Sequence, residues 1–265
     1  MRKVILTTGC DPSEPWTRVH ALTFPRFRKY AERHGYDFVS AWYNGDNYQV
    51  DAARFPEFYA PDQFTAGARN YEVRKDFIRW SLNRQWLAPN WIRYAAIMQL
   101  LETYEVVMYL DGDVVIGDFE TDAIDDPGVV GYSYFSDAKT WLVSPLNGPS
   151  PDNAGPGGPL FIVKSCAEAK AFWTRVWQGR KWISHEWWTD GVDFMDALGY
   201  TIEPPIHKVR DTEYDRSFQI LPSDWMVWFG ANPGQLGHFY HPGGGSGRAD
   251  AKVGEIQRLI AEYGI

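Results

Sequence analysis

The sequence predicts an α/β fold in which helices flank a mostly parallel central sheet. Strand-like and helix-like segments alternate within residues 4–42, which is the order of a βαβ unit. The segment 106–110, Val-Val-Met-Tyr-Leu, is an unbroken apolar run, typical of a strand buried on both faces of a parallel sheet. The 265 residues contain no internal repeat and no low-complexity linker, so a single α/β domain is the simplest organisation.

The first βαβ unit follows from hydrophobic spacing and from one chain-breaking glycine. Residues 4–8 predict a short buried strand, and a Gly-Cys-Asp-Pro loop follows it. Apolar side chains recur at helical spacing over residues 24–34, and Gly35 predicts the end of that helix. Residues 36–42 predict the second strand.

The same criteria place the remaining elements. Helices are expected over residues 72–86, 91–104, 167–178, 187–198 and 252–263. Strands are expected over residues 129–135, 160–163, 219–221 and 225–228. The stretches 44–70 and 145–159 are polar or rich in Pro, Gly and Asn, which predicts loops.

Composition and charge limit the classes of function. The net charge is −8 and the pI is near 5.3, which argues against broad binding of nucleic acid or of an anionic membrane. A small basic pocket for a phosphorylated ligand is still compatible with this charge. The 13 Trp residues fit a protein that stacks aromatic rings on sugars, although we expect most of them in the core.

The cysteines and the apolar runs bear on the cellular compartment. Cys10 and Cys166 form neither a CxxC motif nor a zinc spacing, which predicts a reducing compartment. The apolar run after Met1 ends at Thr7, too early for a signal peptide. Because no segment approaches the 18–20 apolar residues of a membrane span, we expect a soluble, cytoplasmic protein.

The most informative motif is Asp111-Gly112-Asp113, which ends the buried run 106–110. Ligands of open α/β sheets bind at the carboxyl ends of strands. Two carboxylates one residue apart can share a hard divalent cation, which takes oxygen ligands and pairs with phosphate. The motif therefore predicts a Mg²⁺ or Mn²⁺ site that holds a diphosphate, with an ordinary Asp-Gly-Asp turn as the alternative.

A second pattern lies near the carboxyl terminus. His241 is expected at the end of a strand, where its imidazole could bind a metal, and glycines over 243–247 could close around phosphate oxygens. Arg248 and Lys252 would add positive charge for the same phosphates. His238 lies three residues before His241, so the two would face opposite sides of a strand and only one could reach the metal. The alternative is a flexible loop before a terminal helix.

Two weaker patterns concern glycines and acids. Gly157 and Gly158 precede the strand 160–163 and would let a ligand approach the backbone, or would simply form a turn. Asp190 and Asp193 would share one face of a helix that begins there. The alternative role of these acids is to cap that helix and complement its dipole.

The order of these segments resembles a known family. "YAERHGYDF" is followed by "PNWIRYAAIMQLLETYEVVMYLDGDVVI", "GPGGPLFIV", "WWTDGVDFMDAL" and "HFYHPGG". This order resembles nucleotide-sugar glycosyltransferases of the GT-A fold, and within them the fungal Golgi α-galactosyl- and mannosyltransferases and the plant xyloglucan xylosyltransferases. Glycogenin-like enzymes share several of the same positions. The helix followed by the Asp-x-Asp motif is the specific part of the resemblance.

The resemblance implies a single GT-A (Rossmann-like) domain over residues 1–265, with a mixed, mostly parallel sheet. Residues 1–113 would be the nucleotide-binding half and residues 114–265 the acceptor-binding half. Asp111, Asp113 and His241 would hold Mn²⁺ or Mg²⁺ on the donor diphosphate. The residues expected to bind the donor, from the patterns and the resemblance together, are Thr7, Thr8, Gly9, Arg93, Asp111, Gly112, Gly157, Gly158, Gly244, Arg248 and Lys252.

The resemblance also implies a carboxylate beneath the reacting sugar carbon, a role that falls on Asp190. Family members often follow this acid with Gln, whereas this chain has Gly191, so Asp193 is the second candidate for the catalytic carboxylate. Golgi members begin with a membrane anchor that this sequence does not show, which favours a soluble bacterial or viral enzyme.

The predicted function is metal-dependent transfer of a hexose, from UDP-glucose or UDP-galactose, to an acceptor hydroxyl, with the retention of configuration that the resemblance implies. The acceptor is not indicated: a glycan or another hydroxyl compound fits, and nucleic acid is disfavoured by charge. A sugar-nucleotide nucleotidyltransferase is one alternative, but residues 9–15 lack its basic, Gly-rich loop. A non-catalytic carbohydrate-binding module is another, which would not need Asp111, Asp113 and His241 together.

Overall fold

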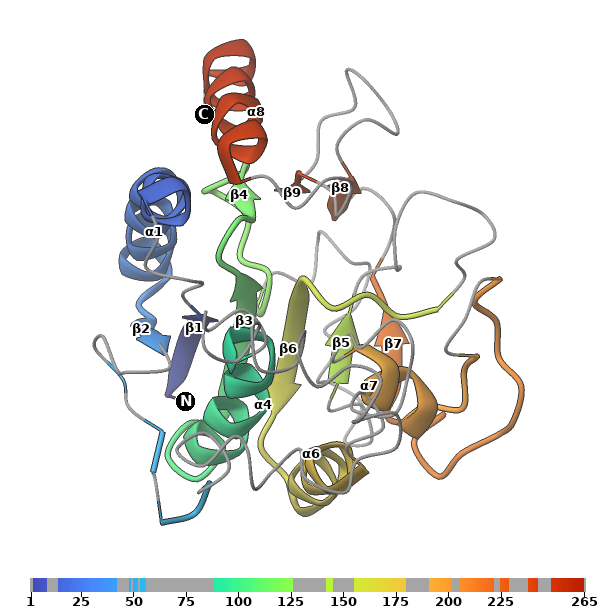
Figure 1. Cartoon of the computed structure of the whole chain (residues 1–265). Helices are drawn as coiled ribbons and strands as arrows, with labels where there is room; N and C mark the ends of the chain where they lie inside the picture. The colour runs from blue at the N-terminus through green and yellow to red at the C-terminus, as the bar shows by residue number, and fades with distance from the viewer. Residues whose placement is uncertain are drawn as a thin grey trace.

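The computed structural model describes the strand that ends at Asp111 and the elements that pack around it. The described residues are 2–8, 14–41, 48, 50–51, 53–55, 88–125, 142–144, 155–179, 191–201, 205–221, 225–228, 238–242 and 249–264. Within them, helices cover a six-stranded sheet, and a three-stranded sheet lies beyond one end of its strands (Figure 1). The helix predicted over 72–86 and the strand predicted over 129–135 lie outside these residues.

The first βαβ unit consists of β1 (Lys3–Thr8), α1 (Glu14–His34) and β2 (Asp37–Ala41), and its strands are parallel. Helix α1 begins ten residues earlier than its hydrophobic spacing predicts and continues through Pro25. The early part buries Val19, against Val115 and apolar residues of the last helix, so tertiary packing stabilises a segment whose sequence signal is weak. The helix ends at His34, and Gly35 follows it with a left-handed φ of 70°, as its position predicts.

The large sheet is mixed, as the resemblance implies. Its strand order is β2-β1-β3-β6-β5-β7, and the strands not yet introduced are β3 (Val106–Asp111), β5 (Leu142–Ser144), β6 (Leu160–Lys164) and β7 (Phe218–Ile220). Strand β6 runs antiparallel to both β3 and β5, while the other pairs are parallel. Because Leu160 pairs with Leu110, the residues before β6 lie beside the carboxyl end of β3.

The first strand of the small sheet follows β3 closely in the sequence. It has the order β4-β9-β8, with β4 (Val115–Ile116), β8 (Met226–Trp228) and β9 (Phe239–His241). Only Gly112, Asp113 and Val114 separate β3 from β4. Val115 pairs with Tyr240, so β9 brings the segment around His241 to the junction of the two sheets.

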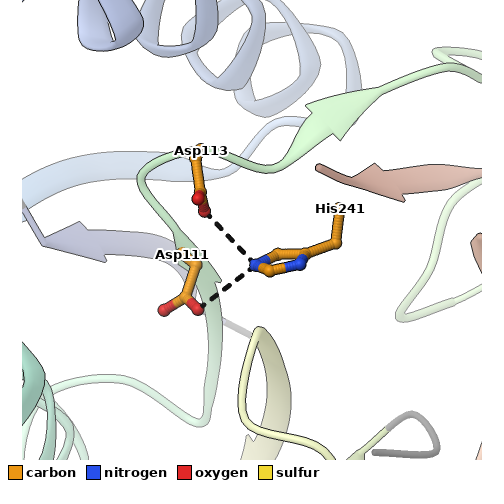
Figure 2. A group of neighbouring side chains, drawn as sticks. All are labelled: Asp111, Asp113 and His241. Atoms are coloured by element: carbon orange, nitrogen blue, oxygen red, sulfur yellow. Dashed lines mark ion pairs between the residues drawn. The ribbon is translucent and has the colours of Figure 1, made fainter. Parts of the chain in front are cut away.

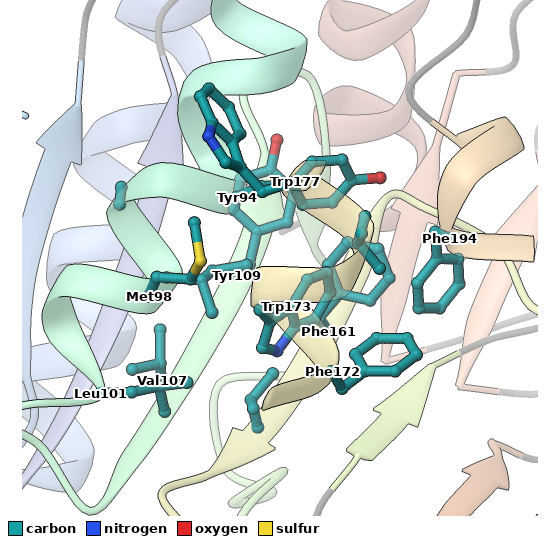
Figure 3. Packing of buried hydrophobic residues seen from close by; sticks show 14 of the residues in the cluster. Tyr94, Met98, Leu101, Val107, Tyr109, Phe161, Phe172, Trp173, Trp177 and Phe194 are labelled. Atoms are coloured by element: carbon teal, nitrogen blue, oxygen red, sulfur yellow. The ribbon is translucent and has the colours of Figure 1, made fainter. Parts of the chain in front are cut away.

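Both faces of the large sheet are buried, which explains the unbroken apolar run in β3. On one face Val107, Tyr109 and Phe161 pack in a cluster with α4 (Ala88–Leu100), α6 (Ala167–Gly179) and α7 (Gly191–Ala197), and fully buried Trp173 lies among them (Figure 3). On the other face Met108 and its neighbours pack against α1. Helix α8 (Ala249–Tyr263) contacts α1 beside the small sheet (Figure 1).

Most described elements lie where the sequence predicts them, with boundary differences. Helix α4 ends at Leu100 rather than 104, and α8 begins at 249 rather than 252. Strand β5 is absent from the sequence prediction, and the structure defines it by its pairing with β6 and β7. None of the helices in the described ranges is both long enough and apolar enough to span a bilayer.

Candidate functional site

Three potential metal ligands converge at the junction of the two sheets. Asp111 ends β3, Asp113 follows Gly112 in the connection to β4, and His241 ends β9 (Figure 2). His241 Nε2 lies 3.4 Å from Asp113 Oδ1 and 3.9 Å from Asp111 Oδ2. One ligand atom from each residue lies within 4.8 Å of the others. Asp113 and His241 are buried, whereas the Asp111 side chain is 28% exposed.

The turn between the two acids depends on a glycine. A Cβ atom on Gly112 would lie 2.9 Å from the backbone oxygen of Thr8 and 3.2 Å from His20 Nε2. The Thr23 hydroxyl donates a 2.6 Å hydrogen bond to the Gly112 carbonyl, and Val114 N–H donates to the Asp111 carbonyl at 3.0 Å. Strand β1 and helix α1 therefore fix the path of the turn, and with it the position of both carboxylates.

One carboxylate oxygen of Asp111 is held by the protein itself. Arg93 Nη1 lies 3.2 Å from Asp111 Oδ1, and the Tyr109 hydroxyl donates to the same oxygen at 2.5 Å. Tyr109 shares a face of β3 with Asp111 because the two are two residues apart. Burial and the charge of Asp111 raise the pKa of Tyr109 well above its usual value, so its hydroxyl keeps its proton and donates. The other oxygen, Oδ2, is the one that faces His241.

One carboxylate oxygen of Asp113 is likewise paired with a basic side chain, which comes from a different helix. Lys252 of α8 forms an ion pair and hydrogen bond with Asp113 Oδ2, while Oδ1 is the oxygen nearest His241. Burial disfavours the charge of Asp113, but Lys252 and His241 outweigh that effect and keep its pKa below the usual range. The Lys252 ammonium also lies 5.4 Å from the centroid of the Trp16 ring.

Arg93 connects Asp111 with the glycines before β6. Its Nη1 donates a 2.8 Å hydrogen bond to the Gly158 carbonyl, and a Cβ on Gly158 would lie 3.1 Å from its Nη2. The Gly157 carbonyl accepts a 2.5 Å hydrogen bond from the Ser144 hydroxyl. These glycines therefore pack against the protein's own polar side chains, and an approach of a ligand to them is still a prediction.

The structure brings together many of the residues singled out from the sequence. Those at or beside the junction are Thr8, Arg93, Asp111, Gly112, Asp113, Gly157, Gly158, His241 and Lys252. Thr8 reaches the site through Tyr109, since the two hydroxyl oxygens lie 3.1 Å apart. Thr7 is fully buried one residue before Thr8 in β1.

Other predicted residues cannot be placed. Gly9, Asp190, Gly244 and Arg248 lie outside the described residues, and Asp193 lies in α7 with a side chain that is also outside them. The catalytic roles predicted for Asp190 and Asp193 are therefore still predictions.

His238 is occupied elsewhere. Its Nδ1 lies 2.9 Å from Asp118 Oδ2, and its ring packs 4.6 Å from the Trp225 ring, centroid to centroid. The sequence argument placed only one of His238 and His241 near the acids, and it is His241 that lies there.

Two features of the site were missed by the sequence analysis. Tyr109 was counted only as part of an apolar run, although its spacing of two from Asp111 was a usable signal. The contact of the Lys252 ammonium with Asp113 was not predicted, and the predicted role of Lys252 on the donor diphosphate is still a prediction. An ion pair between residues so far apart in the sequence leaves no local pattern.

The donor atoms of the cluster fit a divalent cation. Two carboxylate oxygens and one imidazole nitrogen form a set that Mn²⁺ accepts, and Mg²⁺ shares its preference for carboxylate oxygen. Asp111 and His241 are each close enough to Asp113 to share one ion with little movement.

Comparison with known proteins identifies the fold. No family model and no curated protein matches the sequence. Among solved structures, a glycosyltransferase involved in glycosylation of the major capsid of PBCV-1 matches with a TM-score of 0.59 and 14% identity, over 97% of this chain and 99% of that one. The chain has the GT-A fold. The bifunctional glycosyltransferase WbbM also matches, with a TM-score of 0.50 and 11% identity, over 99% of this chain and 51% of that one.

The GT-A fold explains why the site lies where it does. Asp111 and Asp113 sit at the carboxyl end of a central strand of the sheet, where open α/β folds bind their ligands. At identities of 14% and 11% the structural similarity shows the fold alone, and the reaction has to be argued from the site.

Proposed function

We propose that this protein is a metal-dependent glycosyltransferase that moves a hexose from a nucleoside diphosphate sugar to an acceptor hydroxyl. The observation that carries the proposal is the convergence of Asp111, Asp113 and His241 at the carboxyl end of β3 in a GT-A fold. UDP-glucose or UDP-galactose is the donor we expect, and transfer would retain the anomeric configuration, in line with the resemblance described above. The acceptor would be a glycan or another hydroxyl compound.

Asp111, Asp113 and His241 are the residues that would hold Mn²⁺ or Mg²⁺. When bound, the ion would offset the negative charge that develops on the leaving diphosphate. Arg93 and Tyr109 orient Asp111, and Lys252 orients Asp113, so the ligand oxygens are already directed toward His241. Such preorganisation avoids the cost of rearranging the groups during the reaction.

The donor would extend from the end of β1 across the junction of the sheets. We propose that Thr7, Thr8 and Gly9 contact the nucleoside, and that Gly244 and Arg248 contact the diphosphate. Asp190, or else Asp193, would lie beneath the sugar and stabilise positive charge at the anomeric carbon. In this view residues 1–113 bind the nucleotide and residues 114–265 bind the acceptor.

A donor-hydrolysis screen tests this proposal. A panel of nucleotide sugars is incubated with the full chain and Mn²⁺, and released nucleotide is measured. We expect release from a UDP-hexose, lost in Asp113→Asn, which weakens the ligand set without changing its size. Asp211→Asn removes an exposed carboxylate on the chain's surface and is the matched control, expected to keep full activity. The absence of release from every donor, or equal release by wild type and Asp113→Asn, would contradict the proposal.

A further inference from the structure

Each candidate metal-binding carboxylate has one oxygen paired with a cation of the protein and one directed toward His241. Asp111 Oδ1 contacts Arg93, and Asp113 Oδ2 contacts Lys252. The remaining oxygens, Asp111 Oδ2 and Asp113 Oδ1, lie 3.9 and 3.4 Å from His241 Nε2. The set therefore offers one oxygen from each acid and one ring nitrogen.

The charges of these four side chains compensate one another. Two carboxylates face one guanidinium and one ammonium, and three of the four are mostly buried: the side chains of Arg93, Asp113 and Lys252 are 5%, 7% and 15% exposed. Charges in such surroundings are screened weakly by salt. A divalent cation near His241 is thus attracted by two carboxylates and repelled by two nearby positive groups.

Arg93 and Lys252 differ in how extensively their side chains contact the core. Arg93 also bonds the Gly158 carbonyl, and its guanidinium carbon lies 5.1 to 5.3 Å from the ring centroids of Tyr94, Tyr109 and Phe161. Lys252 comes from the first turns of α8, an element outside the large sheet, and lies beside the Trp16 ring. Lys252 is therefore the cation that can be changed with less damage to the core.

We propose that Lys252 is a positioning residue that restricts Asp113 to a single ligand oxygen and weakens the binding of a bare divalent cation. The site then holds the cation tightly only together with an anionic diphosphate, which supplies the negative charge that Lys252 cancels. This inference rests on the proposed function for the identity of the anion. It is separate from a contact of Lys252 with the diphosphate, which would weaken the binding of UDP in a neutral variant.

The test measures binding of Mn²⁺ alone to the full chain, by the loss of the free-ion electron paramagnetic resonance signal. We expect Lys252→Met to bind Mn²⁺ about 30-fold more tightly than wild type, the effect of one unit charge on a divalent cation at about 4 Å in bulk water. Lys252→Arg retains the charge and should stay within about twofold of wild type. Lys170→Met, which removes an exposed lysine of α6, changes the net charge equally and should have no effect.

A second titration adds UDP at saturation. In wild type UDP should strengthen Mn²⁺ binding by a larger factor than in Lys252→Met, because the variant already carries the extra negative charge. If Lys252→Met does not fold, as judged by circular dichroism, Lys252→Gln replaces it in both titrations. The proposal is overturned if the folded neutral variant binds Mn²⁺ no more tightly than wild type, which includes the case in which neither binds.

The outcomes separate this proposal from the proposed function. Nucleotide release that depends on Asp113, with Mn²⁺ affinity unchanged in Lys252→Met, would uphold the glycosyltransferase and reject the role of Lys252. Tighter Mn²⁺ binding in Lys252→Met, with no donor hydrolysed, would uphold the role of Lys252 in a cation site and reject the glycosyltransferase.

Discussion

Arg93 links the ends of two adjacent strands through one side chain. It contacts Asp111 at the end of β3 and the carbonyl of Gly158 before β6, and only 5% of its side chain is exposed. A buried guanidinium is tolerated here because its Nη1 donates to a carboxylate and to a backbone carbonyl. The same contacts make the residue important for stability as well as for the orientation of Asp111.

Replacing Arg93 by Met should lower the free energy of unfolding by about 2–3 kcal/mol, somewhat less than the ~3–5 kcal/mol of a fully buried pair, since Asp111 is 28% exposed. Urea denaturation measures this change. Arg175→Met is the control, because its pair with Glu213 is exposed and should contribute about 0.5 kcal/mol or less. Equal losses of unfolding free energy in the two variants would show that the buried contacts of Arg93 contribute no more than an exposed ion pair.

Gly112 should not tolerate a methyl group. In Gly112→Ala the Cβ would meet the Thr8 carbonyl oxygen at 2.9 Å, and this neighbour is backbone in a central strand, so it cannot move easily. We expect a loss of about 1–3 kcal/mol in unfolding free energy and weaker binding of Mn²⁺ with UDP. Wild-type stability and binding in Gly112→Ala would show that the turn can shift.

At the scale of elements, the sequence predicted best where hydrophobic spacing and chain-breaking residues agree. The end of α1 before Gly35 and the strand before Asp111 are examples. The sequence predicted the elements less well where tertiary contacts determine their bounds. The early start of α1 depends on packing with the last helix, and the short β5 depends on pairing with β6.

The candidate site divides in the same way. Asp111, Asp113 and His241 could be selected because an acidic pair after a buried strand and a late histidine are local patterns. The contacts of Arg93 and Lys252 with these acids could not be predicted from the sequence, because they depend on how α4 and α8 pack beside the sheets.

Helix α8 carries a glycine that its structure does not require. A Cβ on Gly254 would have no heavy atom within 4 Å, and the residue lies inside the helix. Gly254→Ala should therefore stabilise the protein by about 0.5–1 kcal/mol, measured by urea denaturation. A destabilised variant would mean that this part of α8 packs more closely than the structure describes.

The turn after β4 should contribute to stability in a manner that depends on pH. Burial disfavours the charge of Asp118, but hydrogen bonds from Thr121 and the contact with His238 outweigh it and lower the pKa of Asp118. Because the folded pKa lies below the unfolded one, this contribution is present above about pH 4 and is lost as the pH falls through the folded pKa. Asp118→Asn should flatten the acid side of a plot of unfolding free energy against pH. An unchanged acid limb would exclude this role for Asp118.

For the molecule as a whole, the chain combines a GT-A fold with an acidic site at the junction of its two sheets. The mostly parallel class of the large sheet followed from the sequence. The resemblance implied a mixed sheet without saying which strand is reversed, and the sequence could not identify β6, since a buried apolar strand carries no signal of its direction.

Binding of the donor should stabilise the whole fold. A ligand at 100 times its dissociation constant adds about 2.7 kcal/mol, which corresponds to a rise in Tm of about 5–10 °C for a domain of this size. We expect this rise with UDP and Mn²⁺ together in differential scanning calorimetry, and none with UDP in EDTA. Asp113→Asn should show no rise under either condition, and a rise in that variant would place the nucleotide elsewhere.

The junction of the two sheets has one more consequence. Asp111 belongs to the large sheet and His241 to the small one, and the backbone connection between β3 and β4 is only three residues long. An ion shared by the two side chains would therefore join the large sheet to the small one at this point. The amide protons of β9 should then exchange with deuterated water more slowly when Mn²⁺ and UDP are present, while those of β2 at the distant edge of the large sheet keep their rates.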